Sequence, residues 1–261
     1  EGVFSSLSTV ASNTATGNGG NLQIDAETLL IRDGAVLAAT TNGLGNAGDI
    51  RVNSTSTILD GVDAETGSPS GILARTRESA QGSGGDINVN SRNLSLINGA
   101  VINAQTFNAF PSGDIVVNAR SAEFIDGGQI VTSTSSSGTA GTITLNTTEN
   151  LRFAGRDSTY GNRLQQSVSR DSVTPEEFSN ESPSSGLFAN TRPDSSGSGG
   201  RITVNSPTLV LDDGAQISSQ SQGTGAAGPV ILNAANRLQL TNSDIVTVAS
   251  QSSGGNIVIN Q

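Results

Sequence analysis

A short phrase of alternating apolar and polar residues recurs along the whole chain. It ends in asparagine in every copy but the first, which ends in aspartate. Ile, Val and Leu hold its apolar positions, and this period-2 pattern is typical of a β-strand with one buried face. The phrase reads LQID at 22–25, IRVN at 50–53, INVN at 87–90, IVVN at 115–118, ITLN at 143–146, ITVN at 202–205, VILN at 230–233 and IVIN at 257–260. Its last residues are 28, 37, 28, 28, 59, 28 and 27 residues apart, which indicates a 28-residue repeat with two longer copies.

Each repeat holds two further alternating pieces. The second piece reads LLIRDG, LSLING or LVLDDG, and the third reads AVLAAT, AVINAQT or AQISSQS before Gly/Ser-rich text. A glycine after Asp or Asn supplies the positive φ of a tight turn between these pieces. Another glycine precedes the first phrase of every copy: Gly20, Gly48, Gly85, Gly113, Gly141, Gly200, Gly228 and Gly255. We therefore expect three short strands in each repeat.

Three short strands cannot bury a core alone, but stacked copies can pair each strand in parallel with its equivalent in the next coil. The sequence therefore predicts an all-β, right-handed parallel β-helix of about eight coils of about 28 residues, the hand following the usual crossover rule. Gly, Ser, Thr and Asn are abundant and no segment keeps a helical period, which excludes a helical array. We expect one domain over residues 1–261 that belongs to a longer repeat array.

The asparagines that end the phrase would stack at one corner of the coils. Side-chain amides at equivalent positions of stacked strands can hydrogen-bond along the stack. We expect such a ladder, with Asp25 as its one exception, from Asn53, Asn90, Asn118, Asn146, Asn205, Asn233 and Asn260.

The two longer repeats break at the same place, between the second and third pieces. Their insertions span about 62–70 and 156–185, and each returns through similar text, SPSGILARTR at 68–77 and SPSSGLFANTR at 182–192. Proline fixes its own φ and restricts the preceding residue, so we interpret the shared text as a re-entry joint rather than a duplicated binding site. The insertions would protrude three coils apart, about 14 Å along one ridge.

The large insertion is the part of the chain least like the repeat. It holds the only tyrosine, three arginines and an acidic stretch, and long loops on rigid scaffolds often carry function. Its tail favours one helical turn, with Thr174 as cap and Pro175 in the first position. The candidate recognition residues are Arg156, Tyr160, Arg163, Arg170, Glu176 and Glu177.

Composition excludes several kinds of chemistry. The sequence has no Cys, no His and no Lys, so all 13 basic residues are Arg. Disulfides, thiolate metal sites, Ser-His-Asp or Cys-His catalysis and lysine Schiff bases are therefore excluded within this chain. The net charge of −10 comes without a basic cluster, which argues against nucleic-acid binding. No apolar run approaches the ~18 residues of a membrane span.

Carboxylates offer an alternative as a carbohydrate-active enzyme. Asp212–Asp213 and Glu176–Glu177 are adjacent pairs, but glycoside hydrolysis needs two carboxyl groups about 5–9.5 Å apart across a cleft. Asp212 and Asp213 are adjacent at the end of a strand and so point to opposite sides, and we expect no enzyme. Asp33, Asp60, Asp126 and Asp213 lie in the repeated turn, where turn chemistry explains them without calcium, and we expect no metal and no cofactor.

The repeat text resembles the filamentous haemagglutinin-like exoproteins of Gram-negative bacteria, particularly their large cyanobacterial relatives. The resemblance rests on GSGGDINVNSRNLSLINGAVINAQT at 82–106 and GSGGRITVNSPTLVLDDGAQISSQSQGTG at 197–225, with SPSSGLFANTR between coils. It implies a two-partner secretion substrate, exported through an outer-membrane partner and displayed or released as an adhesin. The secretion-signal domain of that family is not evident in this sequence.

Two functions fit these observations. The first is an extracellular β-helical shaft segment of a surface adhesin or filament, secreted or on the cell surface, whose end coils would pair end to end with other copies. The alternative is a module that binds a glycan, a cell surface or a partner protein through the loop at 156–185.

Overall fold

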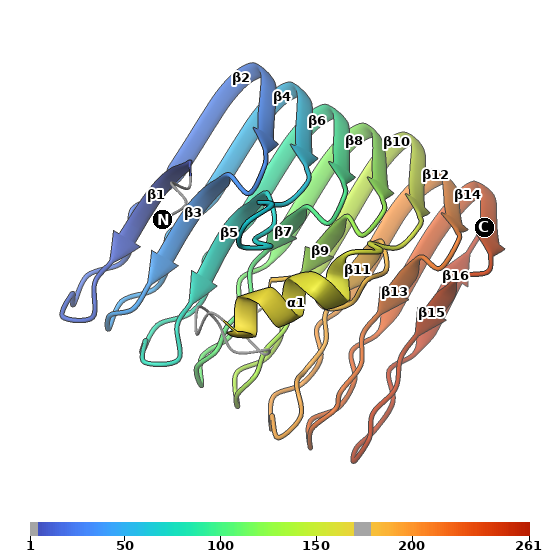
Figure 1. Ribbon diagram of the computed structural model, residues 1–261. Helices are drawn as coiled ribbons and strands as arrows, with labels where there is room; N and C mark the ends of the chain where they lie inside the picture. The colour runs from blue at the N-terminus through green and yellow to red at the C-terminus, as the bar shows by residue number, and fades with distance from the viewer. Residues whose placement is uncertain (1–4, 170–178) are drawn as a thin grey trace.

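The structure is a computed structural model that describes residues 5–169 and 179–261. Its chain winds through alternating long and short strands, which form two separate sheets, each of eight parallel strands in chain order (Figure 1). The parallel β-helix with eight stacked coils predicted from the repeat is thereby confirmed. The first and last strands, β1 and β16, lie at opposite ends of the stack.

One sheet contains the long strands and the other the short ones. We number the coils by their long strands, so that coil 1 contains β2 and β3 and coil 7 contains β14 and β15. The long strands are β2 (Leu22–Arg32), β4 (Ile50–Asp60), β6 (Ile87–Ile97), β8 (Ile115–Ile125), β10 (Ile143–Ala154), β12 (Ile202–Asp212), β14 (Val230–Thr241) and β16 (Ile257–Asn260). The short strands are β1 (Ser6–Ala11), β3 (Val36–Thr41), β5 (Gly71–Thr76), β7 (Val101–Asn103), β9 (Gln129–Val131), β11 (Gly186–Phe188), β13 (Gln216–Ser218) and β15 (Asp244–Val246).

The expectation of three separate strands per coil is wrong in one respect. The first and second predicted strands form one long strand, whose pairing with the next coil continues through both pieces. Alternation breaks in the middle of β6, where Arg92 and Asn93 both face outward, so the sequence looked like two strands. Beyond the short strands of coils 3 to 7, isolated parallel bridges link each coil to the next. They join Thr106, Thr134, Thr191, Ser221 and Ala249.

The core lies between the two sheets and is built from rows of equivalent residues. One row begins the long strands of coils 2 to 7 and is completely buried: Ile50, Ile87, Ile115, Ile143, Ile202 and Val230. Each such side chain contributes about 1.5–3 kcal/mol relative to an exposed one. Phe124 and Phe153 stack in neighbouring coils with ring centroids 4.6 Å apart. The core is thus a continuous apolar column.

The glycine before each long strand is required by close backbone packing. A Cβ built on Gly113 would lie 1.9 Å from the carbonyl oxygen of Gly85, and one on Gly141 would lie 2.0 Å from that of Gly113. No side chain fits at such distances, which explains why the row is glycine from Gly48 to Gly255, whereas at Gly20 the nearest atom is 3.4 Å away.

The turn between long and short strands follows the Asp-Gly or Asn-Gly chemistry. Asp126 and Gly127 have φ values of 48° and 89°, and Asn98 and Gly99 have 55° and 81°. Two successive positive φ values are those of a tight turn that Asn, Asp and Gly favour. This corner is where both insertions leave the solenoid.

Candidate functional site

The phrase-ending asparagines form a continuous hydrogen-bonded ladder on the outer side of the long-strand sheet. The Nδ2 of Asn118 donates to Oδ1 of Asn90 at 2.9 Å, and the same bond joins each neighbouring pair at 2.6 to 2.9 Å. Spacings of 27, 28, 37 and 59 residues all give the same contact, because the insertions leave the ladder register unchanged. The members are Asn53, Asn90, Asn118, Asn146, Asn205, Asn233 and Asn260.

The ladder has a direction. Every amide donates toward the N-terminal coil, and Asn53 donates to Oδ1 of Asp25 at 2.7 Å. Asp25 has no amide donor to continue the row. Hydrogen bonds from Gln23 and Asn53, with a smaller contribution from the charge of Arg51, lower the pKa of Asp25 against a small opposing effect of burial. Its ionised form therefore stabilises the fold at neutral pH, and this contribution is lost as the pH falls through the lowered pKa.

A second row, not expected from the sequence, precedes the long strands. The Oδ1 of Asp49 accepts the backbone N–H of Asp86 at 2.9 Å, and Asp86 accepts that of Asp114 at 2.8 Å. Asn21 and Asp114 make the same contact with the next coil. The sequence signal for this row was the Gly-Asp pair that recurs immediately before the long strands. Burial raises the pKa of Asp86, as do the charges of Asp114 and Asp49, against the backbone hydrogen bond from Asp114.

The re-entry text forms the same joint in both insertions. Ser70 Oγ accepts the N–H of Gly34 in the preceding coil at 3.0 Å and donates to the carbonyl of Asp60 at 2.8 Å. Ser185 Oγ accepts the N–H of Gly127 at 2.9 Å and donates to Ala154 at 2.7 Å. Both serines are fully buried. The serine before the glycine is therefore the shared element of the repeated text.

The prolines contribute less than the sequence suggested. Val62 pairs with Pro69 across the neck of the small insertion, whereas Arg156 pairs with Ser184 across the neck of the large one. Pro69 and Ser184 are therefore equivalent, and Pro183 lies one position earlier. Because the two prolines occupy different places, a common proline geometry does not explain the repeated text.

The large insertion begins with an Asp turn and an unexpected helix. Asp157 Oδ1 accepts the N–H and hydroxyl of Thr159 at 2.8 and 2.6 Å, as Asp63 does for Thr66 in the small insertion. Helix α1 (Tyr160–Ser169) follows. The helical turn expected at Thr174 and Pro175 lies outside the described residues.

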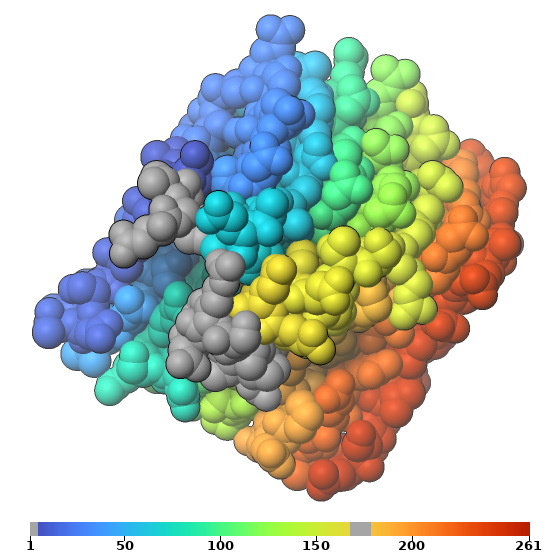
Figure 2. Space-filling model, in the orientation of Figure 1, coloured from blue at the N-terminus to red at the C-terminus, as the bar shows by residue number. Residues whose placement is uncertain are grey.

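Helix α1 does not protrude but lies along the solenoid and contacts the small insertion (Figures 1 and 2). Ser167 Oγ donates to the carbonyl of Thr66 at 3.3 Å, and Arg163 Nη1 donates to that of Gly67 at 3.0 Å. The expectation of two separate protrusions is therefore wrong, because the large insertion folds back over the coils that precede it.

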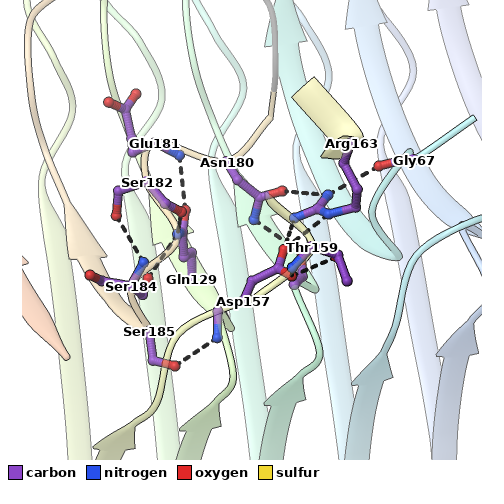
Figure 3. A network of polar contacts seen from close by, with 12 residues as sticks. Gly67, Gln129, Asp157, Thr159, Arg163, Asn180, Glu181, Ser182, Ser184 and Ser185 are labelled. Carbon is purple, nitrogen blue, oxygen red and sulfur yellow. Dashed lines mark hydrogen bonds and ion pairs between the residues drawn. The ribbon is translucent and has the colours of Figure 1, made fainter. Parts of the chain in front are cut away.

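Arg163 and Asp157 form a buried ion pair at this contact (Figure 3). Their side chains are 4% and 6% exposed, and Arg163 Nε donates to Asp157 Oδ2 at 2.9 Å. Asn180 joins the pair from the returning chain: its Oδ1 lies 3.4 Å from Arg163 Nη1, and its Nδ2 donates to the carbonyl of Gly99 at 3.0 Å. Desolvated charges need such complete pairing, so this cluster fixes the position of the insertion.

The returning segment 179–185 is held by buried side chains of the short-strand sheet. Asn103 donates to the carbonyl of Ser179 at 2.8 Å, and Gln129 accepts the N–H of Glu181 at 2.9 Å and donates to the carbonyl of Ser184 at 2.8 Å. Arg75 donates to Ser179 Oγ at 2.9 Å. Three successive coils thus bind this segment.

The candidate recognition residues do not form one exposed group. Arg163 is buried in the ion pair, Arg156 is exposed, and Tyr160 is half-buried. Burial raises the pKa of Tyr160, and the charge of Glu181 adds to that rise. Arg170, Glu176 and Glu177 lie outside the described residues.

A cleft lies between the two insertions at the turn corner. Its volume is about 360 Å³. Exposed Arg156 and Ser158 lie on the side of the large insertion, Val62 on the side of the small one, and Asn98 and Asp126 at the turns. The cleft therefore offers a cation, a carboxylate, an amide and a hydroxyl around one apolar side chain.

Asp212 and Asp213 have separate structural roles. Asp212 lies 3.6 Å from Arg152 across the strands, and Asp213 occupies the positive-φ position of the turn. In residues 5–169 and 179–261, no three Asp or Glu side chains are grouped closely enough to hold a metal ion.

No protein-family model, curated protein or solved structure matches the chain. None of the helical residues in the described part of the chain forms a segment long and apolar enough to cross a membrane.

Proposed function

We propose that the chain is a β-helical shaft segment of an extracellular structural or adhesive protein, of the kind that the resemblance to filamentous haemagglutinin-like exoproteins implies. The observation that carries the proposal is the ladder from Asp25 to Asn260, in which each coil bonds to the next without interruption. A stack in constant register gives a stiff rod that rises about 4.8 Å per coil. Stiffness and reach are what a shaft requires.

The proposal includes display on the surface of a Gram-negative bacterium after export through an outer-membrane partner. It also includes end-to-end pairing between copies, in which strands of two coils would pair in parallel as neighbouring coils do here. An unpaired parallel edge is a template for another strand.

Surface display is tested on intact cells that make the native, untruncated protein. An antibody against residues 1–261 should label unpermeabilised cells, and electron microscopy of the released protein should show rods with an axial repeat of about 4.8 Å. Labelling only after permeabilisation, or particles without that repeat, would contradict the proposal.

The cleft between the insertions favours a second candidate function, the binding of a glycan or a cell-surface ligand. Its polar groups converge at one corner of a rigid scaffold, which is typical of ligand sites. Arg156→Ala together with Asp126→Ala should abolish adhesion of cells to a glycan-coated surface if the cleft is the binding element. Asn236→Ala, at an exposed position of β14 far along the stack, is the control.

A further inference from the structure

The large insertion connects coils that are not neighbours. In a solenoid each coil normally contacts only the coil before and the coil after it. Here the insertion leaves coil 5 and bonds to Gly67 in coil 2, to Gly99 and Asn103 in coil 3 and to Gln129 in coil 4. Together with the bond from Arg75 in coil 2 to Ser179, these contacts join residues from 52 to 104 positions apart in the chain.

The surface under the insertion differs from the rest of the sheet. Leu73, Val101, Val131 and Phe188 face outward from the short strands of coils 2 to 5, yet they are 0–6% exposed and pack into a second apolar cluster. The equivalent outward positions of coil 6 hold Gln216 and Ser218. The outer face where the returning segment 179–185 binds thus combines these apolar side chains with the buried amides of Asn103 and Gln129. Val36 and Ala38 of coil 1 pack against the same cluster, and polar residues follow in coil 6.

Arg163 links its ion pair in the large insertion to the backbone of the small insertion. Arg163 is desolvated, and its partners come from three places: Asp157 at the start of the insertion, Asn180 at its return, and Gly67 in coil 2. If coil 2 opens, Arg163 loses the Gly67 carbonyl and keeps a buried charge with fewer partners, which is strongly unfavourable. Opening of coil 2 is thereby coupled to the position of an element that starts in coil 5.

We propose that the large insertion is a strap that locks coils 2–5 into one cooperative unfolding unit, with Arg163 as the residue that closes it. Coils 6 and 7 lie outside this unit and behave as ordinary neighbours in a repeat array. The proposal concerns stability alone and does not depend on the adhesive function.

Native-state hydrogen exchange measured by mass spectrometry on the whole chain tests the strap. We compare the wild type with Arg163→Met, which keeps an unbranched apolar side chain in place of the arginine stem and removes the charge and the donors. Exchange in β5, β7 and β9 should accelerate by roughly tenfold or more, while β13 and β15 keep their wild-type rates. Arg152→Met is the matched control, because Arg152 is an exposed arginine paired with Asp212 outside the insertion.

Two outcomes would overturn the proposal. One is wild-type exchange in β5 and β7 of Arg163→Met. The other is equal acceleration in β13 and β15, which would mean general destabilisation. If Arg163→Met does not fold, Asn180→Ala provides the same test, since it removes the contacts with Gly99 and Arg163 and leaves the ion pair with Asp157 in place.

Discussion

Ser70 and Ser185 make the same pair of hydrogen bonds, three coils apart. Each accepts the turn glycine N–H of the coil before it and donates to the carbonyl that ends its own long strand. The serine hydroxyl therefore closes the gap that an insertion opens at the corner, and the short strand resumes in register.

Removal of that hydroxyl should destabilise the fold. Ser185→Ala leaves the buried N–H of Gly127 without its acceptor, at a cost of about 1–3 kcal/mol in the free energy of unfolding. Urea unfolding monitored by circular dichroism measures the change. Ser158→Ala, at an exposed position of the same insertion, should stay within about 0.5 kcal/mol of the wild type. Equal stabilities of the two variants would show that the joint does not depend on Ser185.

The stability cost of replacing a glycine of the row that precedes the long strands should depend strongly on which coil it lies in. In Gly113→Ala the new methyl group would overlap the carbonyl of Gly85, and a loss of about 3 kcal/mol or more is expected. Gly20→Ala is the matched control, because the nearest atom to its Cβ is a Thr9 methyl at 3.4 Å. That variant should change stability by less than about 1 kcal/mol. Thermal unfolding separates the two, and a well-tolerated Gly113→Ala would contradict the packing of this row.

The asparagine ladder predicts that a carboxylate is unfavourable inside it. Asn118→Asp keeps the acceptor for Asn146 but loses the donor to Asn90 and places a charge beside the Asn90 oxygen. We expect a loss of about 1 kcal/mol at pH 7. Asn236→Asp, at an exposed position outside the ladder, should have little effect. Similar urea midpoints for the two variants would argue against an energetic role of the ladder.

The raised pKa of Asp86 predicts that its contribution to stability changes with pH in the opposite direction to that of Asp25. Because folding raises the pKa of Asp86 above 3.8, its contribution to stability is present below that value and is lost as the pH rises through the folded pKa. Asp86→Asn retains an oxygen for the N–H of Asp114 but cannot ionise. It should therefore be more stable than the wild type at pH 7, by less than about 1 kcal/mol. Urea midpoints between pH 3 and pH 7 should show this advantage disappear on acidification, and a constant difference would exclude ionisation as its cause.

The repeating part of the fold could be predicted from the sequence because each coil repeats the same local requirements. Ile and Val in rows, the glycine before each strand and the Asp-Gly turn all depend on the nearest coils, so the period alone places them. The union of the first two strands was missed because outward Arg92 and Asn93 interrupt the alternation without interrupting the backbone pairing.

The contact between the insertions could not be predicted in this way. The helical signal in Tyr160–Ser169 is short and rich in Gln, Ser and Asn, and its buried positions Arg163 and Ser167 are polar. The groups that they contact in the small insertion are main-chain carbonyls, which carry no sequence signature. Only Asn103 and Gln129, polar residues at strand positions that bury them, hinted that another segment binds there.

The reach of the large insertion also limits how such a chain can change in length. Duplication of one 28-residue coil preserves the asparagine, glycine and core rows wherever it occurs in the stack. Between coil 2 and coil 5, however, one added coil would move Gly67 about 4.8 Å away from Arg163. The hydrogen bond from Arg163 to the Gly67 carbonyl would then be lost. Coils 2–5 therefore form a segment of fixed length, and growth by duplication is tolerated only outside it.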